Sequence, residues 1–321
     1  MMSTKSILQT IKKNKKFLIS THVSPDPDAL CSELALAIYL KSLGKKVTIV
    51  NHEAVSPRFY FLSGARGIKP YQEGKKESYD VAIVVDCGEL NRVGKVKNLF
   101  RKDKILINID HHVTNDFFGD LNLVEPAASS TAEMLYELLV KAGCVFNKSL
   151  ATHLYTGIMT DTGSFRYENT TARTHAIIAE LLKFKVSAAA IYRKLYEVIS
   201  FHDLKEFTKI INNFDIFLAG KVVCVQLSQK TLSRFSGEFD LRDAIFRFLR
   251  SIGGVEVFVI LTEIDKDRTR VNLRSTNTFD VAKLANNFNG GGGHRRASGG
   301  IINKNIPGAQ KEALGKIEKA L

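Results

Sequence analysis

Apolar and polar positions in the first half of the chain alternate in the manner of an α/β protein. Short apolar runs predict buried strands at 17–20, 46–50, 81–86 and 105–109. Longer stretches predict helices at 29–43, 56–63, 130–142 and 148–159. Ser129 or Ser130 is a suitable N-cap for the third helix, and Gly143 follows its end. Strands that alternate with helices predict a doubly wound α/β domain with a largely parallel sheet.

The second half predicts a smaller α/β domain. Residues 172–213 have helical periodicity and contain no glycine or proline. After them we expect strands at 221–227, 255–264, 269–275 and 298–302, and helices at 240–252, 280–287 and 307–320. The second and third of these strands should form a hairpin across 265–268. The expected organisation is a first domain at 1–185, a helical linker at 186–205 and a second domain at 206–321.

Length and composition fit a two-domain globular protein without a membrane segment. The chain has 321 residues, more than one core usually serves. It contains no apolar run of about 18 residues, and Ile7, Leu8 and Ile11 give its amino terminus the spacing of an amphipathic helix rather than a signal peptide. Its four cysteines form no CxxC pair. We therefore expect a protein of the reducing cytoplasm, without a disulfide framework or a structural zinc site.

The positive charge of the chain is spread over both halves. The net charge is +13, with 25 Lys+Arg against 19 Asp+Glu in residues 1–185 and 21 against 14 in residues 186–321. Solubility alone would account for such a balance. It also favours an anionic partner, such as a nucleotide, a short nucleic acid or a phosphate ester.

Three of the predicted strands end on side chains that bind metal ions. In chain order these are His22, Asp26 and Asp28, then Asp86, then Asp110, His111 and His112. Each group alone would be more typical of a surface loop or a helix cap. Together they predict one site, because the carboxyl ends of parallel strands meet at one edge of a sheet. Imidazole and carboxylate ligands suit manganese, iron or zinc better than calcium.

Two further segments are candidates for the same chemistry. Asp161 lies between small residues that allow a ligand to approach the backbone closely, although an ordinary turn at a helix end has the same composition. The glycine run 290–293 would expose successive backbone N–H groups, and the cationic run His294-Arg295-Arg296 follows it. Since a flexible linker rarely continues into a cationic run and a strand, we expect a loop that cradles phosphate in the second domain.

With these motifs the sequence resembles the DHH phosphoesterase superfamily over nearly the whole chain. The matching segments are His22…Asp26-Pro27-Asp28-Ala29, Val85-Asp86, Asp110-His111-His112 and Thr160-Asp161-Thr162-Gly163. The run Gly291-Gly292-Gly293-His294, with 271–275 upstream, resembles the DHHA1 subdomain, and the pairing at this length resembles the nano-RNase (NrnA-like) branch. Cys31 departs from the family, which usually has glycine there. It leaves the ligands untouched but could crowd the helix start or make the site sensitive to oxidation.

The resemblance implies two divalent metal ions in a cleft between a DHH and a DHHA1 domain. Mn²⁺ is the favoured ion, with Mg²⁺, Fe²⁺ or Co²⁺ as alternatives. One ion would be held by His22, Asp26 and Asp86, and the other by Asp28, Asp86, His111 and Asp161. His112 would face the substrate phosphate, and Asp110 would orient a histidine. Substrate binding is assigned to Arg274, Ser275, Gly291, Gly292, Gly293, His294 and Arg295.

The implied function is hydrolysis of short oligoribonucleotides, including dinucleotides such as pApA and pGpG, and of 3′-phosphoadenosine 5′-phosphate. A phosphodiesterase for linear or cyclic dinucleotides such as cyclic-di-AMP is the nearest alternative. Family II inorganic pyrophosphatases lack the GGGH segment, and RecJ-type exonucleases are normally longer. A nucleic-acid-binding protein with a vestigial site would lack ligands, and none is missing here. Short RNA or small phosphorylated nucleotides are the expected partners, together with a second copy of the chain in a homodimer.

Overall fold

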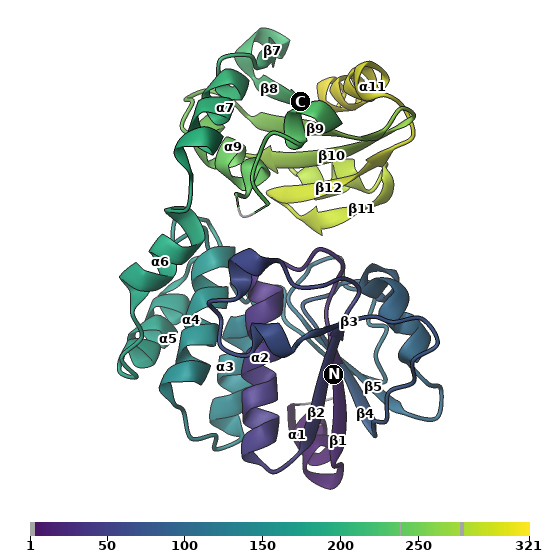
Figure 1. The fold of residues 1–321 in the computed structure, drawn as a ribbon, viewed down its shortest axis with the longest axis vertical. Coiled ribbons are helices and arrows are strands. Elements are labelled where there is room, and N and C mark those ends of the chain that lie inside the picture. The colour runs from purple at the N-terminus through teal and green to yellow at the C-terminus, as the bar shows by residue number, and fades with distance from the viewer. Residues whose placement is uncertain (1–3, 238, 277–278) are drawn as a thin grey trace. The chain divides into compact units, whose positions relative to one another are not determined.

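The structure, a computed structural model, describes residues 4–237, 239–276 and 279–321. It divides into two compact units, residues 1–195 and 196–321, and each unit contains a six-stranded sheet (Figure 1). This agrees with the predicted mixed α/β class. The exact boundaries at 185 and 206, and the expected cleft between the domains, stay predictions.

The first unit contains the predicted parallel sheet. Its strand order is β3-β2-β1-β4-β5-β6, and all neighbouring strands are parallel. The strands are β1 (Lys16–Ser20), β2 (Lys46–Asn51), β3 (Lys69–Pro70), β4 (Val81–Val85), β5 (Ile105–Asp110) and β6 (Leu121–Val124). β4 is buried along its whole length, as expected for a strand covered on both faces. In this register Ser20 pairs with Val84 and Val85 with Ile109, so β1, β4 and β5 end together.

Three helices pack together within the first unit. They are α2 (Pro27–Ser42), α3 (Thr131–Lys141) and α4 (Lys148–Asp161), which lie side by side in Figure 1. The other helices of this unit are α1 (Thr4–Lys13), α5 (Ala172–Leu182) and α6 (Ala188–Tyr196). On the other face of the sheet, the 3₁₀ segment η3 (Leu90–Leu99) contributes Val93 and Val96 to a cluster with Leu18 and Val84.

Two local predictions for this unit need correction or completion. The helix predicted at 56–63 is wrong, because that segment contains only the 3₁₀ turn η1 (Pro57–Phe59). Gly64, with a φ of +95°, follows the segment and separates it from a second 3₁₀ turn, η2 (Ala65–Gly67). The short strand β3 and the half-buried strand β6 were not predicted, since neither has a strong apolar pattern.

The second unit contains a mixed sheet of order β11-β12-β10-β9-β8-β7. Only the β8–β9 pair is parallel among its described pairs. The strands are β7 (Asp215–Phe217), β8 (Val222–Leu227), β9 (Val257–Asp265), β10 (Arg268–Ser275), β11 (Asn289–His294) and β12 (Ala297–Ile302). The predicted hairpin is confirmed as β9–β10.

Helices lie against both faces of the second sheet. One hydrophobic cluster joins it to α10 (Val281–Ala285) and α11 (Ile306–Glu318), and another joins it to α7 (Phe201–Ile211) and α9 (Leu241–Leu249). The short helix α8 (Gln229–Leu232) and the 3₁₀ turn η4 (Leu218–Gly220) complete the unit. The helical stretch predicted at 172–213 consists of α5, α6 and α7.

The glycine run predicted as a loop is a strand. Residues Asn289–His294 form β11, which pairs antiparallel with β12. Glycine is required here by close packing as well as by conformation. A Cβ on Gly291 would collide with the Ala285 backbone carbonyl in α10, and one on Gly300 would lie 2.7 Å from Phe288 Cβ. Gly293 has a φ of +131°, in the region that favours glycine.

Candidate metal centre

The carboxyl edge of the first sheet brings the predicted ligands together. Three groups each place one ligand atom per residue within 4.8 Å of one another. They are Asp86 with His111 and His112, His22 with Asp26 and Asp86, and Asp28 with His111 and Asp161. Because the groups share Asp86 and His111, they form one continuous cluster in the first unit.

Asp86 occupies the centre of this cluster. It directly follows β4 and has a φ of +54°, a left-handed conformation that aspartate adopts more readily than most residues. Its Oδ2 lies 3.8 Å from His22 Nε2, and its Oδ1 lies 3.6 Å from His111 Nε2. The Thr131 hydroxyl donates a hydrogen bond of 2.8 Å to the same Oδ1. One carboxylate oxygen therefore faces each neighbouring group of ligands.

Asp28 is held by the amino terminus of α3. The backbone N–H groups of Thr131 and Ala132 donate to its two carboxylate oxygens at 2.8 and 3.1 Å. Asp26, which is exposed, caps α2 by accepting a hydrogen bond from Ala29 N–H at 3.0 Å. Gly157 of α4 allows α4 to approach closely, because a Cβ there would lie 2.5 Å from Asp28 Oδ1. Helix ends thus fix both aspartates of the first motif.

Asp161 ends α4 and faces the same cluster. Its Oδ2 lies 3.4 Å from His111 Nε2. The chain then turns through three residues with positive φ, Gly163, Ser164 and Phe165. Gly163 is needed there, since a Cβ would overlap the Tyr167 ring. This turn is a strained segment directly after a proposed ligand.

Hydrogen bonds fix the orientation of the three imidazole rings. His22 Nδ1 lies 2.8 Å from the Val23 carbonyl, and His111 Nδ1 lies 3.2 Å from the Ala128 carbonyl. A carbonyl oxygen only accepts, so each Nδ1 carries the proton, and the unprotonated Nε2 of each ring lies near an oxygen of Asp86. His112 differs, since its Nδ1 lies 2.6 Å from Asp110 Oδ1.

A buried polar network supports His112. Asn115 Nδ2 donates to Asp110 Oδ2 at 2.6 Å and to Asn108 Oδ1 at 2.8 Å. Asn108 in turn donates to the Cys87 carbonyl at 3.1 Å. Asp110 is thereby held between Asn115 and His112. Sequence reasoning missed Asn108, Asn115 and Thr131, because only their spatial approach to the motif residues gives them a role.

The electrostatics of the cluster favour a cation. Burial, followed by the charges of Asp161 and Asp26, raises the pKa of Asp28 well above its usual range, and burial with the charges of Asp28 and Asp26 does the same to the pKa of Asp86. Burial also lowers the pKa of His111 to about 4 and lowers that of His22. Closely spaced carboxylates repel one another when all are ionised, and a divalent cation removes this repulsion. Neutral imidazoles beside them are suitable ligands for the same cation.

Burial and Asp110 act on His112 in opposite directions. Burial alone would lower the pKa of this imidazole, but the hydrogen bond and charge of Asp110, with the charge of Asp86, outweigh burial, so the pKa is raised. The pKa of Asp110 is lowered despite its burial, because His112 and Asn115 donate to it. The pair is an imidazole held by a carboxylate, distinct in its bonding from His22 and His111.

The predicted substrate-binding residues lie in the second unit. The Arg274 guanidinium lies over the Phe246 ring at 4.8 Å and donates to the Leu273 carbonyl at 3.1 Å. The buried Ser275 hydroxyl donates to the Phe279 carbonyl at 2.7 Å. Gly291, Gly292 and Gly293 belong to β11, and Arg295 follows it. The side chain of His294 lies outside the described part of the structure.

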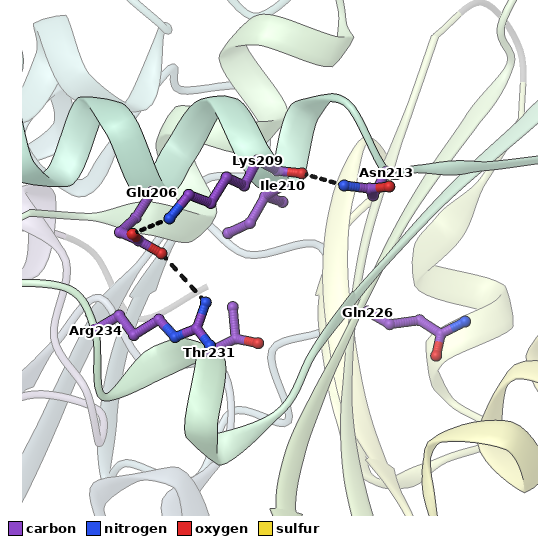
Figure 2. Close-up of a pocket in the computed structure, with 7 residues that line it drawn as sticks. All are labelled: Glu206, Lys209, Ile210, Asn213, Gln226, Thr231 and Arg234. Atoms are coloured by element: carbon purple, nitrogen blue, oxygen red, sulfur yellow. Dashed lines mark hydrogen bonds and ion pairs between the residues drawn. The ribbon is translucent and has the colours of Figure 1, made fainter.

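A polar pocket in the second unit contains none of these residues. It has a volume of about 190 Å³ and lies among α7, β8 and α8 (Figure 2). Glu206 pairs there with Lys209 and with Arg234, the latter at 3.3 Å. Since a carboxylate already engages both cations, this pocket is poorly suited to phosphate.

Known proteins are similar to this chain in both sequence and fold. The DHH family, N-terminal domain, matches residues 16–158, and the DHHA1 domain matches residues 223–321. A Bacillus subtilis (strain 168) protein named bifunctional oligoribonuclease and PAP phosphatase NrnA is 31% identical over 300 residues, covering 92% of each chain. The chain belongs to the DHH family. Family membership makes it a phosphoesterase and confirms the predicted resemblance.

Further relatives support this assignment over almost the full DHH chain. A Thermus thermophilus protein with the same name is 32% identical over 286 residues, covering 88% of this chain and 83% of its own. A solved structure of an exopolyphosphatase-related protein from Bacteroides fragilis has a TM-score of 0.87 and 28% identity, covering 99% of this chain and 94% of its own. Among the described residues of the DHH protein, no helix is long and apolar enough to cross a bilayer.

Proposed function

We propose that this DHH protein hydrolyses short oligoribonucleotides and 3′-phosphoadenosine 5′-phosphate, with two divalent metal ions as cofactor. The single observation that carries the proposal is the buried cluster around Asp86, which unites three groups of metal-binding side chains. The names of the relatives from B. subtilis and T. thermophilus support oligoribonuclease and PAP phosphatase activity as the specific reactions.

The donor set fits the proposed ions. His22 and Asp26 would hold one ion, Asp28, His111 and Asp161 the other, and Asp86 would contact both. Bound ions of this kind polarise a phosphoryl oxygen and activate water as a nucleophile. Mn²⁺ suits this mixture of imidazole and carboxylate, with Mg²⁺, Fe²⁺ and Co²⁺ as the alternatives.

The chain itself supplies orientation and proton transfer. Asp110 accepts a hydrogen bond from the N–H at His112 Nδ1, which leaves His112 Nε2 as the ring atom available to the substrate. We assign His112 to contact the scissile phosphate and to donate a proton from Nε2 to the leaving oxygen. Asn115 keeps Asp110, and through it the imidazole, in one orientation.

The second unit would bind the remaining phosphates of the substrate. We assign this role to Arg274, Arg295, His294 and the glycine strand β11. The basic balance of residues 186–321, 21 Lys+Arg against 14 Asp+Glu, supports an anionic ligand. A linear or cyclic dinucleotide would satisfy the same groups, so a cyclic dinucleotide remains the alternative substrate.

A turnover panel tests the proposal. Purified protein with Mn²⁺ would be given pApA, pGpG, RNAs of two to five residues, a roughly thirty-residue RNA, 3′-phosphoadenosine 5′-phosphate, cyclic-di-AMP and pyrophosphate. We expect rapid hydrolysis of the dinucleotides and of 3′-phosphoadenosine 5′-phosphate. Exclusive hydrolysis of cyclic-di-AMP would favour the alternative. Binding of RNA without turnover of any substrate would contradict an enzymatic role.

A further inference from the structure

Arg92 lies beside the metal centre although it belongs to no motif of the family resemblance. It follows Asp86 by six residues, on the 3₁₀ segment η3. Its backbone carbonyl accepts a hydrogen bond of 2.7 Å from Val23 N–H, next to His22. Gly94 allows η3 to lie this close to the loop, because a Cβ there would lie 2.7 Å from Val23 Cγ1. The fold therefore fixes Arg92 against the loop that carries His22.

The charge of Arg92 reaches residues from three strand ends. It contributes to lowering the pKa of His22, after burial has done so, and it acts in the same direction on the pKa of His112 and of Cys87. These effects agree with the backbone position of Arg92, whose carbonyl is bonded to the loop that carries His22. Arg92 itself is only partly buried, so its donors remain accessible.

The guanidinium has no protein partner among the residues that the structure describes. Neither a hydrogen bond nor an ion pair of its side chain is present there, although the neighbouring cluster contains four carboxylates. Arg173 in the same unit shows the contrast, since Glu125, Glu133 and Glu137 all engage it. An arginine that is held beside a carboxylate cluster without pairing to it has its donors available for another anion.

We propose that Arg92 binds a non-bridging oxygen of the scissile phosphoryl group. The inference rests on the proposed function and adds to it a phosphate-binding residue from the first unit. The planar guanidinium offers two parallel N–H donors, which match the oxygens of a phosphoryl group. In this role Arg92 stabilises the negative charge that develops on phosphorus during hydrolysis, while His112 acts on the leaving oxygen.

A purely structural role for Arg92 predicts different effects of its substitution on metal and substrate affinity. If the guanidinium served only to balance the carboxylates, its removal would alter metal affinity or stability and leave substrate affinity unchanged. A phosphate-binding role predicts the opposite. Removing a cation close to the metal centre should leave Mn²⁺ affinity unchanged or slightly higher, and should weaken the binding of anions.

The test compares Arg92→Ala, Arg92→Gln and Arg92→Lys with Lys95→Ala, which removes an exposed charge from the same segment. Steady-state hydrolysis of pApA gives kcat and KM. Calorimetric titration of the Mn²⁺-loaded enzyme with 5′-AMP gives a product Kd, and titration of metal-free enzyme with Mn²⁺ gives metal affinity. We expect Arg92→Ala to lose about 100-fold in kcat/KM and to bind 5′-AMP more weakly. Arg92→Lys should recover part of the loss, and Lys95→Ala should behave as the wild type.

Each outcome decides the inference. Wild-type kcat/KM and 5′-AMP affinity in Arg92→Ala would overturn it, as would a loss confined to Mn²⁺ binding. Should Arg92→Ala fail to fold, Arg92→Gln and Arg92→Lys decide, and equal 5′-AMP affinity in these two variants would refute a charge-dependent phosphate contact. A wild-type enzyme that hydrolyses nothing in the panel contradicts the proposed function instead, and the 5′-AMP titration then still tests Arg92 separately.

Discussion

The Thr131 hydroxyl donates a 2.8 Å hydrogen bond to Asp86 Oδ1, and both residues are buried. Thr131 is the first residue of α3, and its backbone N–H also donates to Asp28. One residue outside the motifs thereby connects two proposed ligands. It fixes the position of a carboxylate that would contact both metal ions.

Thr131→Val keeps the shape of the side chain and removes this hydrogen bond. We expect Mn²⁺ affinity to fall about tenfold or more, because the carboxylate is no longer held in one orientation. Thr131→Ser keeps the hydroxyl and serves as the control, with affinity near the wild type. Calorimetric titration with Mn²⁺ measures both, and equal affinities in the two variants would show that Asp86 needs no support.

Gly157→Ala should damage the site although it lies in a helix, where alanine is intrinsically favoured. The added Cβ would lie 2.5 Å from Asp28 Oδ1 and 2.7 Å from Ala132 Cβ. Because misplaced ligands reduce turnover steeply, we expect kcat on pApA to fall about 100-fold. Gly315→Ala in α11 is the matched control, since nothing lies within 4 Å of its Cβ. That variant should gain up to about 1 kcal/mol in free energy of unfolding at full activity. Full activity in Gly157→Ala would contradict the geometry.

Substitution of His111 should reduce metal content, whereas substitution of His112 should reduce turnover. His111 Nε2 faces Asp86 and Asp161, whereas His112 Nδ1 is bonded to Asp110. We expect His111→Ala to lose metal, and His112→Ala to retain it while kcat falls about 100-fold or more. Metal analysis of purified protein beside the kinetics distinguishes them. One ring nitrogen of His112 also lies within 4.8 Å of ligand atoms of Asp86 and His111. Equal metal loss in both variants would therefore make His112 a ligand.

Glu33, which is not among the proposed metal ligands, should make stability depend on pH. Burial raises the pKa of this carboxyl from its ordinary value of 4.5 to about 8, and Asn51 offers it one hydrogen bond of 2.9 Å. The folded chain therefore retains a proton that the unfolded chain releases above pH 4.5. The contribution of this proton to the free energy of unfolding is fully present below that pH. The free energy of unfolding then falls by up to about 1.4 kcal/mol per pH unit as the pH rises to about 8.

The Glu33→Gln variant should lack this dependence. Denaturant unfolding of both proteins between pH 5 and 9 would give the difference in free energy of unfolding. We expect the variant to become more stable relative to the wild type as the pH rises. A constant difference would show that Glu33 does not hold a proton in the folded chain.

The fold and the ligand cluster could be predicted from sequence for a common reason. Apolar runs mark β1, β4 and β5 strongly, and the parallel arrangement then requires Asp86 and His111 to meet at one edge. The same reasoning could not find Thr131, Asn115 or Arg92. Their roles depend on how a helix start, a loop and a 3₁₀ segment approach that edge in three dimensions.

The errors have equally local causes. The segment 56–63 has an acceptable helical pattern, but it forms only a 3₁₀ turn that begins at Pro57, and Gly64 with its positive φ follows directly. The glycine run 290–293 is expected to form a loop because successive glycines would expose backbone N–H groups to phosphate. The structure instead pairs this run with β12, and its close contact with α10 requires glycine, since any side chain at Gly291 would collide with Ala285.

The proposed ligands extend from His22 to Asp161, on the β1–α2 loop, the first turn of α2, two further strand ends and the last turn of α4. No single stretch of the chain contains the complete set. During synthesis, a nascent chain would therefore expose only partial sets of ligands until α4 has left the ribosome. Tight metal capture would then be one of the last events in the maturation of this unit, because the group of Asp28, His111 and Asp161 is complete only once α4 is present.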